Sequence, residues 1–285
     1  MDAGIGATIG PPAGSCVMNA QALPVFEQLQ LSRAGRVLSL VLHRPDKLNA
    51  FGRVMHAELV DALQFAARDE HADVIVLTGS GSAFSAGGDI ESMEQVARDP
   101  ALFDREAADA KRIVLTLLDM DKPVIAKVNG HAVGLGATLA LLCDVIFMAE
   151  NAKIGDPHVK VGLVAGDGGA FIWPQLIGYA RAKELLFTGD LLSAARAAEM
   201  GLINHAVPAA LLDQTVQTFC DRLTRGAMQA IRGTKATVNL ELRRMALAAL
   251  DAGLALESLS VRSADHREAV RAFREKRAPR FGSPQ

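Results

Sequence analysis

Two glycine-rich stretches hold the backbone groups most suited to chemistry, residues 83–90 (AFSAGGDI) and residues 129–136 (NGHAVGLG). Each follows a β-branched apolar run, at 74–78 and 124–128, and the second opens an apolar helical stretch over 135–143. Glycine lets another group approach the main chain closely, and a helix start leaves N–H groups unpaired. Two such N–H groups aimed at one oxygen form an oxyanion hole, which stabilises an enolate or a tetrahedral intermediate. Glycine spacing alone fits two plain strand-to-helix turns equally well.

A second group of candidates is His158 and Asp167, which lie on one glycine-flanked segment. Imidazole titrates closest to neutrality of all side chains and is the most common general base. A single histidine on a loop is more often structural, and an aspartate before a helix is a good N-cap. A carboxylate can also orient an imidazole, as in catalytic triads. In that case Asp167 would lie within hydrogen-bond reach of one ring nitrogen, and the other nitrogen would face the cleft.

Four motifs, in order along the chain, resemble those of the crotonase superfamily, also called the enoyl-CoA hydratase/isomerase family. They are the turn at 43–50, the loop at 83–93, the segment at 122–144 and the C-terminal residues 273–281. Several spaced motifs in register are far more specific than one glycine pattern. The resemblance implies an α/β fold, a crotonase-type spiral of βαβ units with a helical C-terminal portion.

The resemblance also implies a site for an acyl-CoA thioester. The backbone amides of Gly88 and Leu135 would be the oxyanion donors, and the leucine, where the family usually has a glycine, would narrow the pocket above the thioester. Coenzyme A would enter as part of the substrate, with no prosthetic group. The residues expected to bind the substrate and its coenzyme A are Lys47, Ala50, Ala86, Gly88, Asp89, Ile90 and Leu135.

The two glutamates that hold water in hydratases of this family are absent from the positions that the resemblance assigns to them. Thr138 occupies the first position, and His158, after Pro157, occupies the second. A threonine hydroxyl can orient water but cannot act as a general base at neutral pH. The combination of His158 and Asp167 resembles the branch of the superfamily that hydrolyses carbon–carbon bonds in cyclic β-diketones. Many chains named simply enoyl-CoA hydratases share the pattern, so it does not decide between them.

Three functions therefore stay open. The leading hypothesis is a hydratase- or isomerase-type lyase of fatty acid metabolism, which acts through an enolate with His158 as the base and hydrates crotonyl-CoA only weakly. The second is a retro-Claisen carbon–carbon hydrolase in which His158 and Asp167 activate water. The third is a pseudoenzyme that binds acyl-CoA after losing its acid–base pair.

The composition fits a globular enzyme, with 285 residues, half of them apolar, and a net charge of −2. This near-balance argues against a nucleic-acid surface, and the basic stretch at 267–280 is interrupted by glutamates, which favours a solvated helix face over a phosphate-binding patch. Cys16, Cys143 and Cys220 have neither paired nor metal-ligand spacing, so we expect no metal site and a cytoplasmic location. No apolar stretch reaches the roughly 18 residues needed to span a bilayer, so no membrane partner is expected.

The elements that must position these residues alternate between strand and helix, which predicts a mostly parallel sheet. We expect a disordered leader at 1–22, an α/β core at 23–205 and a helical region at 206–285, which in the family builds trimers or dimers of trimers (hexamers). The expected strands and helices in the core are a hairpin at 26–31 and 36–42, helices at 53–68, 99–118 and 135–143, and strands from 74, from 124 and at 145–149. The later expected helices are 167–177, 181–187, 193–200, 209–225, 227–240 and 242–277, the last of them broken.

Overall fold

The computed structural model describes residues 22–282, so the leader expected at 1–22 lies outside the described residues apart from Ala22. A six-stranded sheet in the order β1-β2-β3-β5-β7-β10 forms its centre. Only the β1–β2 hairpin is antiparallel, and the other pairs are parallel. The strands are β1 (Leu29–Ala34), β2 (Val37–Leu42), β3 (Val74–Gly79), β5 (Val124–Val128), β7 (Val145–Ala149) and β10 (His205–Val207). Every residue of β3 is buried, as expected for a parallel strand covered on both faces.

A second sheet has four strands in the order β4-β6-β8-β9, and three of them come directly after strands of the first sheet along the chain. Its strands are short: β4 (Ala83–Ser85), β6 (His131–Val133), β8 (Lys153–Gly155) and β9 (Leu192–Ser193). Strand β6 pairs in parallel with β4 on one side and with β8 on the other. The sequence did not predict this sheet. It brings together the three loops that start at residues 86, 134 and 156.

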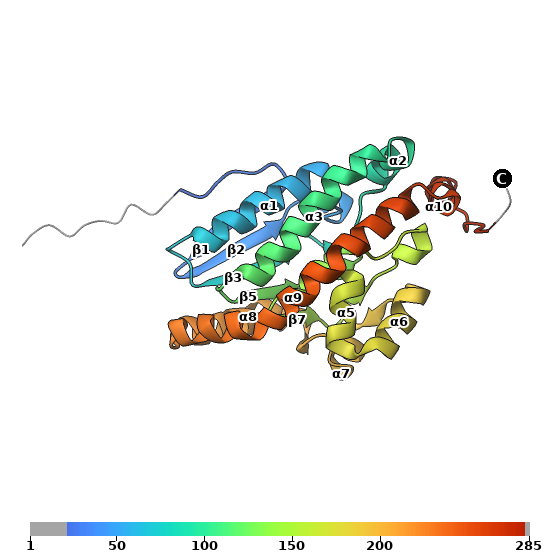
Figure 1. Cartoon of the computed structure of the whole chain (residues 1–285). Helices are drawn as coiled ribbons and strands as arrows, with labels where there is room; N and C mark the ends of the chain where they lie inside the picture. The colour runs from blue at the N-terminus through green and yellow to red at the C-terminus, as the bar shows by residue number, and fades with distance from the viewer. Residues whose placement is uncertain (1–21, 283–285) are drawn as a thin grey trace, which may run out of the picture.

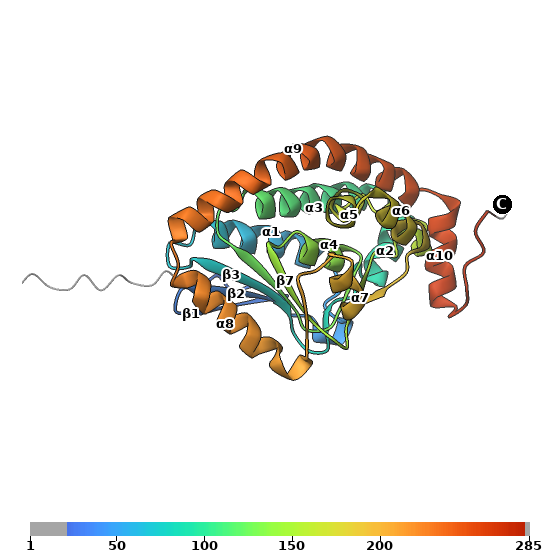
Figure 2. The same ribbon diagram turned by 90° about the horizontal axis from the view of Figure 1, so that it is seen from below.

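Helices cover the large sheet on both faces. Figure 2 shows α8 on one face and α1 on the other, with α3 packed over α1 and α9 arching over α3. The α-helices are α1 (Arg53–Arg68), α2 (Ile90–Arg98), α3 (Ala101–Asp119), α4 (Leu135–Leu141), α5 (Gly169–Ile177), α6 (Tyr179–Thr188), α7 (Ala194–Glu199), α8 (Leu212–Thr224), α9 (Met228–Val261) and α10 (Ala264–Arg274). The 3-10 helices are η1 (Pro45–Lys47), η2 (His158–Val161) and η3 (Ala209–Leu211).

The C-terminal helices differ from the sequence-based prediction. A break was expected near residue 241, but α9 runs through it without interruption for 34 residues (Figure 1). Its buried residues, among them Ala246, Leu250 and Leu254, form one stripe at helical spacing, and this stripe continues across the expected break. The chain turns only after Val261, where the Ser263 side chain accepts a hydrogen bond from the His266 N–H and starts α10.

Helix α2 is a further correction, because the sequence predicted a loop at 83–93 and no element at 94–98. The Asp89 side chain accepts hydrogen bonds from the N–H groups of Glu91 and Ser92, and so caps this helix. A small hydrophobic cluster then joins α2, α3 and α9, separate from the main core. Its buried members are Val96, Phe103, Leu163 and Val261.

Two of the three cysteines lie in the part of the chain that the structure describes. Cys143 and Cys220 are buried and unpaired, whereas Cys16 lies outside the described residues. Among the described helices, none combines the length and the apolar character that crossing a bilayer requires.

Candidate active site

The two glycine-rich loops lie against each other at the ends of β4 and β6. A Cβ atom on Gly87 would lie 2.7 Å from the Val133 carbonyl oxygen, so this contact leaves no room for a side chain. The φ angle of Gly87 is +84°, in the left-handed region that favours glycine. The close approach of the loops brings Gly88 and Leu135 to the wall of one cleft.

The N–H groups of Gly88 and Leu135 are the two predicted oxyanion donors. The neighbours of Gly88 are engaged, because Phe51 N–H donates to the Gly87 oxygen (2.7 Å) and Asp89 N–H donates to the Phe51 oxygen (2.8 Å). Leu135 begins α4, where the first N–H groups have no partner inside the helix. Within residues 22–282, neither of the two N–H groups has a protein partner. Both are therefore free to bind an oxygen atom.

The cleft consists of two connected hollows. The first has about 650 Å³ and the second about 980 Å³ of empty space, in part open to solvent, and they share Gly88, Asp89, Met93 and His158. Leu135 lines the first hollow. The other residues expected to bind the acyl-CoA line the second: Lys47, Ala50, Ala86, Gly88, Asp89 and Ile90. Of the charged residues in this set, Asp89 is paired with Arg44 (2.7 Å) and Lys47 with Glu91 (2.6 Å).

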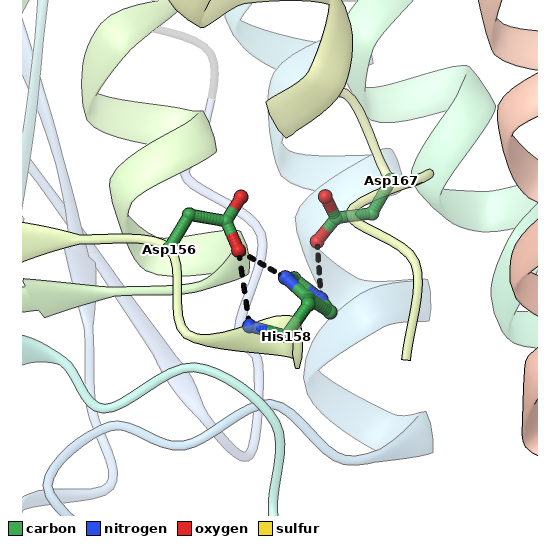
Figure 3. A group of neighbouring side chains, drawn as sticks. All are labelled: Asp156, His158 and Asp167. Atoms are coloured by element: carbon green, nitrogen blue, oxygen red, sulfur yellow. Dashed lines mark hydrogen bonds and ion pairs between the residues drawn. The ribbon is translucent and has the colours of Figure 1, made fainter. Parts of the chain in front are cut away.

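His158 lies where the hollows meet, between carboxylates (Figure 3). It begins η2, and its Nδ1 is hydrogen-bonded to Oδ1 of Asp156, a residue on the loop just after β8. Its Nε2 lies 3.5 Å from Oδ2 of Asp167 and 3.9 Å from Oε1 of Glu257. The His158 side chain is only 12% exposed. We call these four residues the His158 cluster.

The partner of Nδ1 corrects the expected pairing. Asp156, not Asp167, makes the hydrogen bond that orients the imidazole, and Asp167 faces the other ring nitrogen at a longer distance. The remaining oxygen of Asp167 accepts from the Gly169 N–H (3.3 Å) and from the buried Thr138 hydroxyl (3.4 Å). Asp167 therefore accepts a hydrogen bond at the start of the helix that follows it and also lies beside the imidazole. The Thr138 hydroxyl donates to the Asp167 oxygen that is not beside the imidazole.

Glu257 reaches the cluster from α9, far along the chain. A Cβ atom on Gly166 would lie 2.2 Å from the Gly253 carbonyl oxygen, so a glycine at position 166 lets α9 pack directly on the loop that holds Asp167. Glu257 follows Gly253 by one helical turn and so points at the same place. Sequence analysis missed Asp156 and Glu257. Only Asp156 had a local signal, because it lies two residues before His158.

The pKa values of His158, Asp167 and Glu257 are all raised. Burial lowers the pKa of the His158 imidazole, but the nearby carboxylates outweigh burial and raise it well above its ordinary value of 6.5. Burial raises the pKa of Glu257 well above 4.5, and the other carboxylates add to that shift against the opposing charge of His158. Burial and the charge of Asp156 likewise raise the pKa of Asp167. These shifts favour the protonated imidazole and oppose the loss of a proton from Asp167 and Glu257.

Three members of the cluster also satisfy the spacing of a metal site, although the sequence indicated none. Asp156, His158 and Asp167 each offer one ligand atom, and these atoms lie within 4.8 Å of one another. The hydrogen bond between His158 and Asp156 shows that the same atoms are already matched as proton donor and acceptor.

Comparison with known proteins identifies the family of this chain. A family model described as enoyl-CoA hydratase/isomerase matches residues 32–284. The chain belongs to the enoyl-CoA hydratase/isomerase family. This family is part of the crotonase superfamily, whose members act on acyl-CoA thioesters, and the fold agrees with that assignment.

Individual members of the enoyl-CoA hydratase/isomerase family resemble the chain over nearly its whole length. It is 33% identical over 260 residues to 2,3-dehydroadipyl-CoA hydratase of Escherichia coli, covering 90% of this chain and 99% of that protein. It is 36% identical over 247 residues to 1,2-epoxyphenylacetyl-CoA isomerase of the same organism, covering 86% and 94%. A crystal structure of an enoyl-CoA hydratase/isomerase from Mycobacterium paratuberculosis superposes with a TM-score of 0.82 at 38% identity, covering 86% of this chain and 97% of that one.

Proposed function

We propose that this chain catalyses proton transfer on an acyl-CoA thioester through an enolate, with the N–H groups of Gly88 and Leu135 holding the thioester oxygen. The observation that carries the proposal is the position of His158. Its Nδ1 is held by Asp156, and its Nε2 faces two further carboxylates in the cleft that also contains the two free N–H groups. A Cβ atom on Gly134 would lie only 3.6 Å from Cε1 of His158, so the imidazole adjoins the second oxyanion loop.

The cluster supplies the acid and the base that the two absent glutamates would provide. In hydration, the oxygen of water bonds to the β-carbon of the enoyl thioester, and its proton passes to the Asp167–Glu257 pair. The π-electrons move onto the thioester carbonyl and give an enolate, which the two N–H groups stabilise. The α-carbon then takes a proton from Nε2 of the His158 imidazolium. The carboxylate pair returns its proton to the imidazole and restores the starting state.

This series of proton transfers gives His158 a different role from the one expected from the amino-acid sequence, in which it was the base. Because its raised pKa favours the imidazolium form, His158 acts as the acid in this proposal, while a carboxylate acts as the base. The same groups serve double-bond isomerisation when a substrate γ-proton replaces the proton of water. Each proton moves between water, substrate and side chains, so the proposed reaction needs no prosthetic group.

The His158 cluster also favours a second candidate, the carbon–carbon hydrolase. An imidazole oriented by a carboxylate is suited to activating water, and the enolate that leaves on bond cleavage would be held by the same two N–H groups. A pseudoenzyme is less well supported. Burying three carboxylates around one imidazole lowers folding stability, and a site that only binds has no use for such a cluster.

A substrate panel with the purified protein distinguishes these functions. In deuterium oxide we expect turnover of crotonyl-CoA with deuterium at the α-carbon, or of vinylacetyl-CoA with deuterium at the γ-carbon, and loss of either turnover in His158→Gln. Cleavage of a free cyclic β-diketone, without turnover of any thioester, would establish the hydrolase instead. Acyl-CoA binding with neither reaction would identify a pseudoenzyme and overturn the proposal.

A further inference from the structure

The first hollow extends beyond the reacting groups into a pocket with an unusual polar content. Its walls include Leu163 and Val261 of the small hydrophobic cluster, which fit an acyl chain. Five polar residues outside the His158 cluster line this hollow. His56 and Asp89 contact the Gly52 carbonyl and Arg44, and the other three, Ser92, Glu106 and His266, line the part farther from these contacts. We call this part of the first hollow the inner pocket. None of its three polar residues takes part in the proposed reaction.

His266 lines the first hollow and has one ring nitrogen that carries a lone pair. The residue is 1% exposed, and its Nδ1 lies 2.7 Å from the Val161 carbonyl oxygen. A carbonyl oxygen only accepts hydrogen bonds, so Nδ1 carries the proton and Nε2 carries the lone pair. Burial lowers the pKa of His266, which keeps the ring in this neutral form. Among the described protein groups, Nε2 has no partner.

Glu106 gives the inner pocket a second acceptor. Its Oε1 accepts a hydrogen bond from the Ser92 hydroxyl (2.9 Å), which uses the only hydrogen-bond donor of that side chain. A carboxylate has further acceptor sites, so the pair remains an acceptor overall. The inner pocket therefore offers lone pairs from Glu106 and His266 and lacks a free side-chain donor among its three polar residues.

We infer that the inner pocket selects acyl groups that carry a hydrogen-bond donor, such as a hydroxyl, at the end remote from the thioester, and that His266 determines this selectivity. The inference rests on the proposed function, because it assumes that the acyl group enters the first hollow. A hydroxyl donates to Nε2 and so satisfies a buried acceptor. A methyl group leaves Nε2 without a hydrogen-bond partner. A terminal carboxylate would face the lone pair of His266 and the carboxylate of Glu106.

Binding of saturated acyl-CoA ligands tests the inference without relying on turnover. We would measure Kd by calorimetry for three series of increasing chain length that end in a methyl, a hydroxymethyl or a carboxylate group. At the length that reaches His266, we expect the hydroxyl ligand to bind about tenfold more tightly than the methyl ligand, from one hydrogen bond to a buried acceptor. The carboxylate ligand should bind most weakly. Equal affinity for hydroxyl and methyl ligands at every length would overturn the inference.

Two variants assign the effect to Nε2. His266→Asn keeps an amide N–H for the Val161 oxygen and removes Nε2, so it should lose the preference for the hydroxyl while still binding the methyl ligand. His266→Phe keeps the ring volume and should lose the preference in the same way. A hydroxyl preference that survives in both variants would contradict the role of His266. If the preference is found but no thioester is turned over, the proposed function fails and the selectivity of the pocket stands.

Discussion

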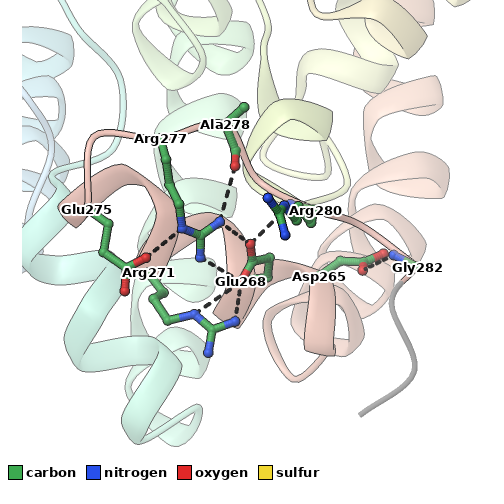
Figure 4. A network of polar contacts seen from close by, with 8 residues as sticks. All are labelled: Asp265, Glu268, Arg271, Glu275, Arg277, Ala278, Arg280 and Gly282. Atoms are coloured by element: carbon green, nitrogen blue, oxygen red, sulfur yellow. Dashed lines mark hydrogen bonds and ion pairs between the residues drawn. The ribbon is translucent and has the colours of Figure 1, made fainter.

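The molecule contains two clusters of carboxylates and cations with opposite chemistry. In the His158 cluster three carboxylates surround one imidazole, and burial raises the pKa values of Asp167 and Glu257. On α10, Glu268 is surrounded by cations instead (Figure 4). Its carboxylate accepts from Arg277 (2.5 Å), from Arg271 and from the Arg280 N–H (3.0 Å), and these hydrogen bonds hold its pKa well below the ordinary value.

The difference lies in the ratio of carboxylates to cations and in the exposure of the cations, because the side chains of Arg271 and Arg277 are 66% and 33% exposed and that of His158 only 12%. Where cations outnumber a carboxylate, the carboxylate is ionised at all ordinary pH values. Its contacts then only hold neighbouring segments of the chain together. Where carboxylates outnumber the cation and water is excluded, protons stay bound and are available for transfer. The Glu268 cluster therefore joins α10 to the residues that follow it, and the His158 cluster is suited to acid–base catalysis.

The largest effect should come from the two residues at the centre of the His158 cluster. His158→Gln removes the proton donor, and Asp156→Asn removes the carboxylate that orients it, so each should lower kcat on the order of 10²- to 10⁴-fold. The double variant should be scarcely slower than either single variant, because the two residues act as a unit. Glu268→Gln is the control and should leave kcat unchanged. Independent, multiplying effects of the two substitutions would contradict the coupling.

A loss of similar or somewhat smaller size should follow from removing one oxyanion donor. Gly88→Pro deletes an N–H that makes no hydrogen bond within the described residues, and should lower kcat about 10²- to 10³-fold. Gly88→Ala is the matched control, because it keeps the N–H and adds only a Cβ that would meet the flexible end of Met93. Thermal unfolding of both variants would show that each is folded. Wild-type turnover by a folded Gly88→Pro protein would exclude this donor.

The dependence of kcat on pH sharpens the contrast further. Activity that needs the imidazolium is present below its pKa and is lost as the pH rises through that value. Because the pKa of His158 is raised, the alkaline limb should lie well above pH 6.5. Asp156→Asn and Glu257→Gln each remove a negative charge, so both should move this limb to lower pH. An alkaline limb that stays fixed in both variants would assign it to another group.

The smallest effect is expected at the Glu268 cluster, and it concerns stability alone. Glu268→Gln should lower Tm near neutral pH, since a carboxylate with a depressed pKa stabilises the fold above its unfolded-state pKa. This contribution is lost as the pH falls from about 4.3, the ordinary glutamate value, towards the folded-state pKa. The two melting curves should therefore converge in acid. A Tm difference that grows on acidification would show that the arrangement of charges in Figure 4 does not govern stability.

The sequence predicted local features well because they depend on neighbouring residues. The helix at 53–68 and the strand at 145–149 lie where periodicity placed them, and the glycine-rich loops meet as the family resemblance implied. Two members of the His158 cluster could not be predicted from the sequence. Asp156 is one of many aspartates until β8 and η2 fix its direction, and Glu257 looks like any helical glutamate until the contact between Gly166 and Gly253 brings α9 to the cleft.

The late position of Glu257 also has a consequence for the order in which the protein matures during synthesis. The ribosome releases both oxyanion loops, Asp156, His158 and Asp167 well before α9 exists. A nascent chain can therefore complete the large sheet while its acid–base centre still lacks one carboxylate and the cleft lacks the walls that Leu254 and Val261 provide. Catalytic competence should appear only when α9 docks, so activity records the last stage of maturation and sheet formation an earlier one.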